Sequence, residues 1–388
     1  MHLLRVFSFT HPDSGGPIAA ALQLTPFLRQ AGVDTEFACC DRPDSPWLGE
    51  FPGQVHAFGP ARGRYGYAPA LRRWLVRHAC NYDAVIVHGL WQYPGQAVWR
   101  TLRDQPTPYY VYPHGMLDPG LAQLTPNRHL SKRVYWRLLE RRILADAAGV
   151  LFTTEEEARL ARQSFHPAHW RTQVLNYGIG GPPARFNRDA IFEVQPQLRD
   201  RPWLLFLGRI HPKKGCDLLV QAIARLQDQL GDLQVVMAGP DEIGWQAELQ
   251  QQAADLGIAE RFVWPGPLRD DLKWSALHHC QALILPSHQE NFGIVVAEAM
   301  AAGRPVLITE PVNLAAAVQE AGAGRVAPDT LDGVAALLRG WLELSPAERQ
   351  RMGEAAARLY RSRYTLERAA TSLLSVLQSP SRNQHPCG

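Results

Sequence analysis

The stretch 282-ALILPSHQENFGIVVAEAMAAGRPVLIT-309 determines the fold class that we expect for this chain. It begins with an apolar run at 282–287 and ends with another at 305–309. Between them, 292–303 reads as a helix that ends at a glycine, and Asn291 is a good candidate for its N-cap. Short, continuously apolar strands separated by helices are typical of parallel sheets covered on both faces. The stretch therefore predicts an α/β fold.

The same alternation runs along the rest of the chain and is interrupted once. The interruption, residues 178–202, is rich in Gly, Pro and charged residues, as linkers between domains are. We therefore expect two Rossmann-like doubly wound domains, at 1–180 and 181–362. A last helical segment follows at 363–378, and we expect the tail 379–388 to be disordered. The other apolar runs lie at 3–9, 84–89, 109–115, 149–154, 173–179, 203–210, 233–240 and 261–267.

Composition and charge exclude several classes of protein. The 388 residues carry 40 basic and 37 acidic side chains, a net charge of +3, which is too balanced for a general nucleic-acid binder. No apolar run reaches the roughly 20 residues that span a bilayer, and residues 1–9 read as a strand rather than as a cleavable signal. The six cysteines form no Cys-x-x-Cys pair and no cluster with histidine. We therefore expect buried thiols in a cytoplasmic protein, with neither disulfides nor a zinc site.

Two acids accompany the predicted helix, Glu290 in the loop before it and Glu298 within it. That loop follows a strand and so lies at the carboxyl edge of the sheet, where open α/β sheets bind ligands. The first amides of the helix, at Phe292 and Gly293, offer a site for phosphate. Glu298 then accepts hydrogen bonds from hydroxyls on one side of the phosphate, and Glu290 faces the group on the other side. A sugar nucleotide has this layout; two ordinary surface glutamates are the alternative.

A basic loop follows another strand. In 207-LGRIHPKKG-215 the strand runs into a loop that holds Arg209, Lys213 and Lys214. Cations at this edge of a sheet neutralise a diphosphate. Arg engages its oxygens through bidentate hydrogen bonds, and Lys acts as a point charge. They also stabilise the charge on a departing phosphate. A solvated basic loop without a ligand is the alternative.

Four segments together resemble the family 4 glycosyltransferases. These segments are 208-GRIHPKKG-215, 238-AGP-240, 265-PGPL-268 and 286-PSHQENFGIVVAEAMAAGRPV-306, and the resemblance covers nearly the whole chain. It implies the GT-B fold, in which two Rossmann-like domains face a central cleft and the last helix crosses back to the amino-terminal domain. It also implies transfer of a hexose from a nucleoside diphosphate sugar to a hydroxyl of a glycan or lipid-linked acceptor, with retained anomeric configuration.

The resemblance also implies roles for individual residues of the carboxyl-terminal half. Arg209 and Lys214 hold the donor diphosphate, and the amides around Phe292 and Gly293 form the phosphate-binding turn. No cofactor and no metal ion are expected, because no Asp-x-Asp stands at a plausible donor site, and the cations and the helix dipole then stabilise the leaving diphosphate. Asn291 is also expected among the donor contacts; it departs from the family, in which many members have Gly there, and either narrows the turn or adds a side-chain contact. The remaining donor contacts are Glu298 to the ribose, Glu290 to the transferred sugar, and the backbone at Pro267 and Leu268 to the base.

The amino-terminal half carries further candidates. Gly15 and Gly16 stand between the first strand and a helix, and the family places there a Gly-rich turn that faces the donor phosphate and the acceptor. No complete G-x-G-x-x-G follows the strand, which argues against a nicotinamide-binding domain. His114 matches the active-site histidine of the family, where it hydrogen-bonds a sugar hydroxyl or receives a proton. Candidates for the acceptor side are His88, Asp118 and Trp91, the last of which either stacks on a sugar or packs in the core.

A basic amphipathic segment lies at 126–149. Four cations recur there at helical spacing, with apolar residues elsewhere on the helical wheel, which is a pattern found in helices that lie on anionic lipid. A solvated face over a core stripe is the alternative. Many members of the family glycosylate lipid-linked acceptors, so we expect peripheral association with the inner face of the plasma membrane and a role in cell-surface or exopolysaccharide biosynthesis. The four cations are Arg128, Lys132, Arg137 and Arg141.

Two other functions fit many of the same residues. A GT-B-like sugar-nucleotide epimerase binds the same donor but needs no acceptor, and a non-catalytic protein binds a sugar nucleotide without reacting it. Incubation with a labelled donor separates the epimerase from the transferase, because only the epimerase isomerises the sugar. The full set Arg209, Lys214, Glu290 and Glu298 argues against the non-catalytic protein.

Overall fold

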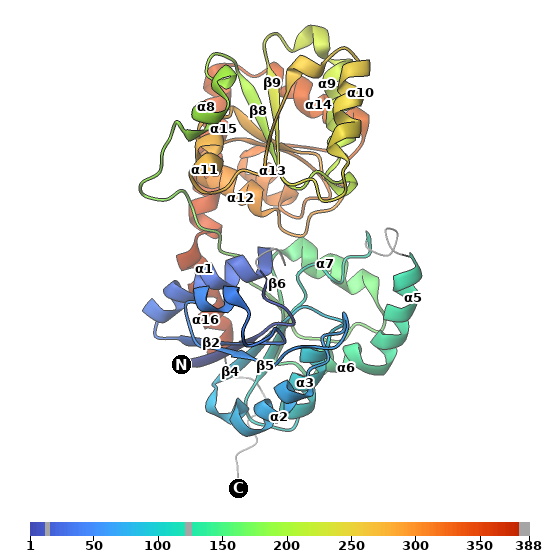
Figure 1. The fold of residues 1–388 in the computed structure, drawn as a ribbon, viewed down its shortest axis with the longest axis vertical. Coiled ribbons are helices and arrows are strands. Elements are labelled where there is room, and N and C mark those ends of the chain that lie inside the picture. Colours follow the sequence, from blue (N-terminus) through green and yellow to red (C-terminus); the bar gives the residue numbers. More distant parts are fainter. Residues whose placement is uncertain (12–15, 121–125, 380–388) are drawn as a thin grey trace. The chain divides into compact units, whose positions relative to one another are not determined.

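The computed structural model describes residues 1–11, 16–120 and 126–379, and in the helix that begins at Pro126 it describes the side chains from Leu130 onward. The chain forms two compact units (Figure 1). The first unit comprises Met1–Gly178 together with the segment that begins at Leu366, and the second comprises Ile179–Thr365. The expected boundaries were 180 and 362. The tail that we expected to be disordered lies, after Ser379, outside the described residues.

The first unit contains a parallel sheet of seven strands in the order β3-β2-β1-β4-β5-β6-β7. The first six strands follow the doubly wound order, in which the chain reverses direction along the sheet between β1 and β4. All the residues of β4, β5 and β6 are buried, as the apolar runs predicted. The strands are β1 (His2–Val6), β2 (Asp34–Cys39), β3 (Val55–Ala57), β4 (Ala84–His88), β5 (Tyr109–Tyr112), β6 (Gly149–Phe152) and β7 (Thr172–Val174).

Helices bury both faces of this sheet. One core lies under α2, α3 and α6, and a smaller one packs Phe7 and Phe37 against α1. The last helix of the chain, α16, packs beside α1 (Figure 1). It is tied to the first unit by hydrogen bonds at Tyr110 and Asn176. The helices are α1 (Gly16–Gln30), α2 (Pro69–His78), α3 (Tyr93–Leu102), α5 (Pro126–Tyr135), a π-helical turn η4 (Trp136–Glu140), α6 (Arg141–Asp146), α7 (Glu155–Ser164) and α16 (Leu366–Gln378).

The second unit repeats the doubly wound order with six parallel strands, β10-β9-β8-β11-β12-β13, so its direction reverses between β8 and β11. The strands are β8 (Trp203–Leu207), β9 (Gln234–Ala238), β10 (Phe262–Gly266), β11 (Ala282–Leu285), β12 (Val306–Thr309) and β13 (Gly324–Ala327). The helices are α8 (Ala190–Val194), α9 (Cys216–Arg225), α10 (Gln246–Asp255), α11 (Asp270–His279), α12 (Ile294–Ala301), α13 (Ala315–Ala321), α14 (Leu331–Leu342) and α15 (Pro346–Arg363).

The predicted N-cap at Asn291 is wrong. Helix α12 begins at Ile294, and its N-cap is Gly293, whose φ of +82° is left-handed. The helix starts late because Glu290 is still extended and pairs with the segment around Val312 as a parallel bridge. Glycine then turns the chain into the helix, since it adopts positive φ without the penalty that a side chain brings.

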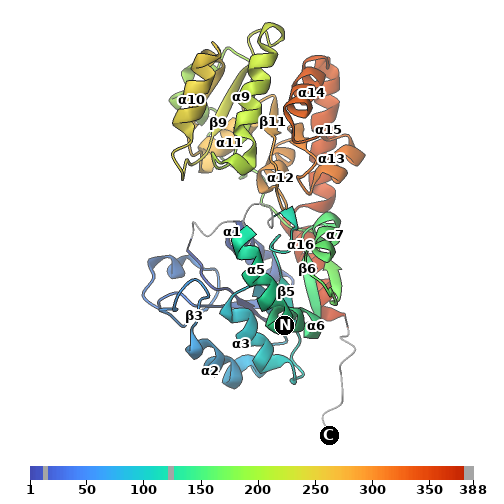
Figure 2. The same ribbon diagram turned by 90° about the vertical axis from the view of Figure 1, so that its right-hand side faces the viewer.

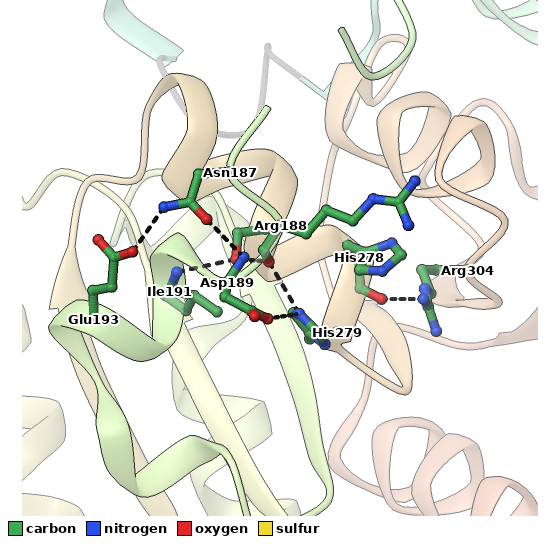
Figure 3. Close-up of polar contacts among 9 residues, drawn as sticks. Asn187, Arg188, Asp189, Ile191, Glu193, His278, His279 and Arg304 are labelled. Carbon is green, nitrogen blue, oxygen red and sulfur yellow. Dashed lines mark hydrogen bonds and ion pairs between the residues drawn. The ribbon is translucent and has the colours of Figure 1, made fainter. Parts of the chain in front are cut away.

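A polar cluster fixes the start of the second unit on α11 (Figure 3). His279 Nε2 lies 3.0 Å from the carbonyl oxygen of Arg188 and 3.1 Å from Asp189 Oδ1. Asn187 Nδ2 donates to Glu193 Oε1 at 2.8 Å, and Arg304 donates to the carbonyl of His278. His279, on α11, contacts both Arg188 and Asp189, so we interpret the cluster as an anchor for the segment that enters the unit.

Candidate functional site

Two loops meet in the second unit where β8 and β11 lie side by side. The amide of His288 donates to the carbonyl of Lys213 at 2.8 Å. Gly215, with φ +62°, lies so close to Pro286 that a Cβ there would be 2.1 Å from the Pro286 carbonyl oxygen. Glycine is therefore required for the two loops to approach this closely. Their meeting point is the reversal point of the sheet, the place at which doubly wound folds bind ligands.

Lys214 and Glu290, two of the predicted site residues, form an ion pair at this point. Their side chains are only 16% and 20% exposed, so the pair is largely withdrawn from water. The backbone of Glu290 is fixed on both sides, because its amide donates to Pro311 and its carbonyl accepts from Asn313, each at 3.1 Å. A cation and a carboxylate are thereby held together where the two loops meet.

The amino-terminal end of α12 lies beside this pair. A Cβ on Gly293 would lie 3.4 Å from Cγ of Glu290, and no side chain caps the helix. The amides of Ile294 and Val295 are among the first in the helix and have no carbonyl partner within it. Phe292 is buried, and its ring meets the ring of Tyr364 edge-on at 5.6 Å. The arrangement suits a phosphate at the start of α12.

Glu298, on α12, is buried and pairs with a residue that sequence reasoning missed. Its Oε1 lies 2.6 Å from Nζ of Lys273 on α11, and that Nζ lies 5.0 Å from the ring centre of Trp274. No spacing in the sequence relates a lysine at 273 to a glutamate 25 positions later. Lys273 neutralises Glu298 here, as a buried carboxylate requires.

The other predicted donor residues are more scattered. Arg209 Nη1 lies 3.1 Å from Glu242 Oε2, and both side chains are about half exposed. Arg209 is thus in the same loop as Lys214 but has its own carboxylate partner. Pro267 is exposed and Leu268 is buried, directly after β10.

In the first unit, two predicted residues are in contact: His88 Nδ1 lies 2.9 Å from His114 Nε2, and their rings are nearly parallel. His88 ends β4, and His114 follows β5, the neighbouring strand. A buried arginine on β1, Arg5, donates from Nε to His88 Nε2 at 3.2 Å and from Nη1 to the carbonyl of Ala21 at 3.2 Å. Sequence reasoning missed Arg5, although a charged residue within an apolar strand is a visible signal.

The contact with Arg5 determines where both histidines carry their protons. A guanidinium only donates, so Nε2 of His88 accepts and its proton lies on Nδ1. That proton is donated to Nε2 of His114, and neutral His114 therefore carries its own proton on Nδ1. Burial, together with the charge of Arg5, lowers the pKa of His88 well below its ordinary value and that of His114 to about 3. Both rings are neutral near pH 7.

A buried carboxylate holds the backbone at His114. His114 has a left-handed φ of +51°, a strained conformation for a residue with a side chain. Glu157 Oε1 accepts from the amide of Gly115 at 2.6 Å, and its Oε2 accepts from the amide and the hydroxyl of Thr153, each at 2.7 Å. These bonds fix the loop against α7. Glu157 is thus a positioning residue that the sequence did not assign to the site.

The contacts described for Trp91 and Asp118 are made with residues other than the histidine pair. The ring of Trp91 packs among Trp136, Phe165 and Tyr135. Asp118 Oδ1 accepts from the amide of Gly120 at 2.8 Å. Gly16 begins α1 and Gly15 lies outside the described residues.

The basic amphipathic segment forms α5 and η4. Arg137 is exposed and Arg141 half-buried, whereas Lys132 reaches back to 5.4 Å from the ring centre of Trp91. The side chain of Arg128 is outside the described residues. Three apolar side chains of the segment are not in a core, and their relative exposures are 68%, 54% and 67% for Leu130, Val134 and Leu138. No helix among the described residues has both the length and the apolar character to cross a bilayer.

Curated relatives of the chain are glycosyltransferases. The D-inositol 3-phosphate glycosyltransferase of Geodermatophilus obscurus is 29% identical over 344 residues, which are 84% of this chain and 71% of that protein. The enzyme of the same name from Mycobacterium marinum is 26% identical over 386 residues, 94% of this chain and 81% of that one.

Solved structures share the fold. A glycosyltransferase from Rickettsia africae has a TM-score of 0.79 at 14% identity, covering 98% of this chain and 99% of that chain. Sucrose-phosphate synthase from Thermosynechococcus elongatus has a TM-score of 0.76 at 20% identity, with 97% and 98% covered. Anabaena HepE in complex with UDP and glucose has a TM-score of 0.75 at 18% identity, with 98% and 100% covered. These likenesses confirm the predicted GT-B fold.

Two family models match successive parts of the chain. The model described as "Glycosyl transferase 4-like domain" matches residues 15–178, and the one described as "Glycosyl transferases group 1" matches residues 187–359. The two matches correspond closely to the two structural units. The chain therefore belongs to the group 1 glycosyltransferases of the family 4 type.

Proposed function

We propose that the protein transfers a hexose from a nucleoside diphosphate sugar to a hydroxyl of a glycan or lipid-linked acceptor, with retention of the anomeric configuration. The observation that carries the proposal is the Lys214–Glu290 pair beside the uncapped start of α12. This pair lies where the sheet of the second unit reverses, and it offers a cation, helix amides and a carboxylate to one ligand. The relatives support a sugar-nucleotide donor, since Anabaena HepE was solved with UDP-glucose.

In the proposed donor complex, Lys214 contacts the diphosphate together with the amides at the start of α12. Arg209 leaves Glu242, its exposed partner, to reach the same phosphates. Glu290 is then free to accept hydrogen bonds from the transferred sugar. Glu298 accepts from the ribose hydroxyls while Lys273 keeps it from being a buried, unpaired charge. The donor thus exchanges the Lys214–Glu290 and Arg209–Glu242 pairs, whereas the Lys273–Glu298 pair is retained.

The chemistry that we propose is same-face substitution without a metal ion. The bond from the anomeric carbon to the diphosphate oxygen breaks, and the acceptor oxygen forms its bond on the same face. The leaving phosphate accepts the acceptor proton, while Lys214 and the dipole of α12 stabilise the charge that develops on it.

Neutral His114 is proposed to donate a hydrogen bond from Nδ1 to a sugar hydroxyl. Its Nε2 already accepts from His88, and its lowered pKa makes it a poor proton acceptor near pH 7. The protein therefore uses His114 to orient a hydroxyl rather than to remove its proton.

The exposed residues of α5 and η4 support peripheral attachment to anionic lipid. Leu130, Val134 and Leu138 recur every four residues, so they share one side of the helix, with Arg137 close to them. An apolar stripe flanked by cations suits the interface of a membrane. We propose that the enzyme acts on the cytoplasmic face of the plasma membrane, in cell-surface or exopolysaccharide biosynthesis.

Two assays test the proposal. A thermal-shift panel of UDP-, GDP- and ADP-sugars is expected to raise the melting temperature with one nucleotide class, because a ligand of the native state stabilises it. With that donor and an acceptor, NMR of the product is expected to show the anomeric configuration of the donor. A product with inverted configuration would contradict the retaining mechanism. No change of melting temperature with any sugar nucleotide of the panel would contradict the donor site.

A further inference from the structure

A groove lies between two helices of the first unit, α2 and α3, which run side by side in both views (Figures 1 and 2). It has a volume of about 430 Å³. Arg72, Arg73 and Arg77 line it from α2, and Arg100 lines it from α3. We call these four residues and the space between them the arginine groove. Neither family resemblance nor the donor site accounts for it.

Helical spacing explains why these side chains face one another. On α2 the lining residues include Pro69, Arg72, Arg73 and Val76, which lie on one side of the helix at intervals of three and four. On α3 the lining residues Tyr93, Gln96, Ala97 and Arg100 follow the same intervals. The two faces therefore present their cations into one space.

The charges in this groove are not balanced by acids. No carboxylate is among the residues that line it, and within the described parts of the chain none of its four arginines forms an ion pair. Other exposed arginines do pair, for example Arg42 with Asp44 and Arg159 with Glu156. Like charges one turn apart on a helix, such as Arg73 and Arg77, destabilise it, so an anion bound between them would remove a repulsion.

The chemistry of the lining selects the ligand. Guanidinium groups bind phosphate oxygens through paired hydrogen bonds, and the amide of Gln96 and the hydroxyl of Tyr67 add neutral partners. Tyr67 and Val76 also expose apolar surface there, which suits an organic phosphate better than a bare ion. The volume falls within the range of roughly 300–1,000 Å³ found for small-molecule sites.

We propose that the arginine groove binds a discrete phosphorylated molecule and that this is a second anion site, separate from the donor site. The groove begins at the first residues of α2 and α3, and α3 starts soon after His88, at the carboxyl edge of β4. The arginines follow further along the helices, with Arg77 and Arg100 in their last turns. Because the groove belongs to the unit that carries the histidine pair, we assign the phosphorylated molecule to the acceptor. This assignment to the acceptor rests on the proposed function, whereas the anion site itself does not.

Calorimetric titration of the full chain with inorganic pyrophosphate tests the site. Replacing two exposed arginines together, Arg73→Gln and Arg77→Gln, is expected to weaken binding at the groove at least about tenfold. The matched control, Arg358→Gln with Arg361→Gln, removes two exposed arginines from α15 and is expected to leave pyrophosphate binding unchanged. If both double variants lose pyrophosphate affinity equally, or if neither loses any, the proposed site is overturned.

Two single variants keep this result separate from folding and from the donor site. Arg100→Gln, on the other helix, is expected to weaken the same binding, and its melting temperature is expected to match the wild type because the side chain is exposed. Lys214→Gln is expected to remove only the donor-site component of pyrophosphate binding. If Lys214→Gln leaves pyrophosphate binding unchanged while the groove variants weaken it, the groove is supported and the donor site is contradicted. If Lys214→Gln weakens binding and the groove variants do not, only the groove is contradicted.

Vesicle flotation identifies the source of the phosphate. Vesicles of phosphatidylcholine alone are compared with vesicles that also contain phosphatidylglycerol. A discrete ligand predicts that Arg73→Gln with Arg77→Gln weakens pyrophosphate binding and leaves flotation unchanged. Loss of both supports a groove that also takes the phosphate of a lipid headgroup. Loss of flotation with unchanged pyrophosphate binding overturns the proposal in favour of a flat lipid surface.

Discussion

The buried candidate residues of the two units are stabilised in different ways. In the second unit Glu290 and Glu298 are each paired with a lysine. In the first unit His88 and His114 lie beside a buried cation, Arg5, and avoid charge altogether by staying neutral. A buried charge is stabilised by an opposite charge, as in the second unit, or by hydrogen bonds to neutral groups, as at Arg5, whereas a neutral group needs only hydrogen bonds.

This difference fits the ligands that we propose for the two units. In the proposed donor complex the Lys214–Glu290 pair is exchanged for the ligand, because the diphosphate takes over the lysine while the transferred sugar takes over the carboxylate. The neutral histidine pair offers direction without charge, which suits hydroxyl groups. The following predictions test the comparison, beginning with the largest expected effect.

Lys214→Met is expected to lower kcat/KM by about a hundred- to a thousandfold, because it removes a cation from the diphosphate and leaves Glu290 without its partner. Steady-state kinetics with the donor found in the thermal-shift panel measure this effect. Lys214→Arg keeps the charge and is expected to recover part of the activity. Turnover of Lys214→Met within a few-fold of wild type would contradict the exchange of ion pairs.

Lys273→Met is expected to lower the free energy of unfolding by about 2 kcal/mol, because it strands the buried carboxylate of Glu298. Urea denaturation measures the change. The control is Arg42→Met, which breaks an ion pair whose side chains are 64% and 68% exposed, and is expected to have no measurable effect. Equal effects in the two variants would mean that burial does not distinguish the pairs.

The histidine pair is expected to make the protein sensitive to acid. The folded-state pKa of His114 is lowered, so the unfolded chain takes up a proton that the native state does not, and stability is lost as pH falls from about 6.5 toward 3. His114→Gln is expected to reduce this slope by up to about 1.4 kcal/mol per pH unit. His2→Gln, at an exposed histidine, is the control, and unfolding curves at several pH values provide the measurement.

Glu140→Gln tests a dependence of stability on pH that has the opposite sign, and its expected effect is the smallest. Burial raises the pKa of Glu140 to about 8, so its protonated form contributes stability that is lost as pH rises from about 4.5 toward 8. The glutamine cannot titrate and still accepts from the amide of Trp91. The melting temperature of the variant relative to wild type is expected to rise by a few degrees between pH 5 and pH 8. A constant difference would contradict the assignment.

The sequence predicted those features that follow from strand ends. Lys214 and Glu290 each follow an apolar strand, β8 and β11, and parallel neighbours bring their carboxyl ends together. Strands β2, β3 and β13 were not predicted. β2 begins with Asp34, Thr35 and Glu36, so it lacks a continuous apolar run, and the three residues of β3 are only half-buried.

Contacts between residues distant in the sequence could not be predicted. Lys273 reaches Glu298 from another helix, and Arg5 reaches His88 from another strand. Asn291 was a reasonable cap by composition, yet the bridge between Glu290 and Val312 delays the helix until Gly293. Pairing and capping of this kind depend on where the whole sheet places its loops.

The position of α16 has a consequence for biosynthesis. A ribosome makes the 187 residues from Ile179 to Thr365 before the helix that completes the first unit exists. Domains usually fold as units while the chain emerges, with the first one finished earliest. Here the unit translated first is completed last. One face of its sheet stays uncovered, and open to aggregation, until Leu366–Gln378 has been made. A fragment that stops at Gly178 would never cover this face.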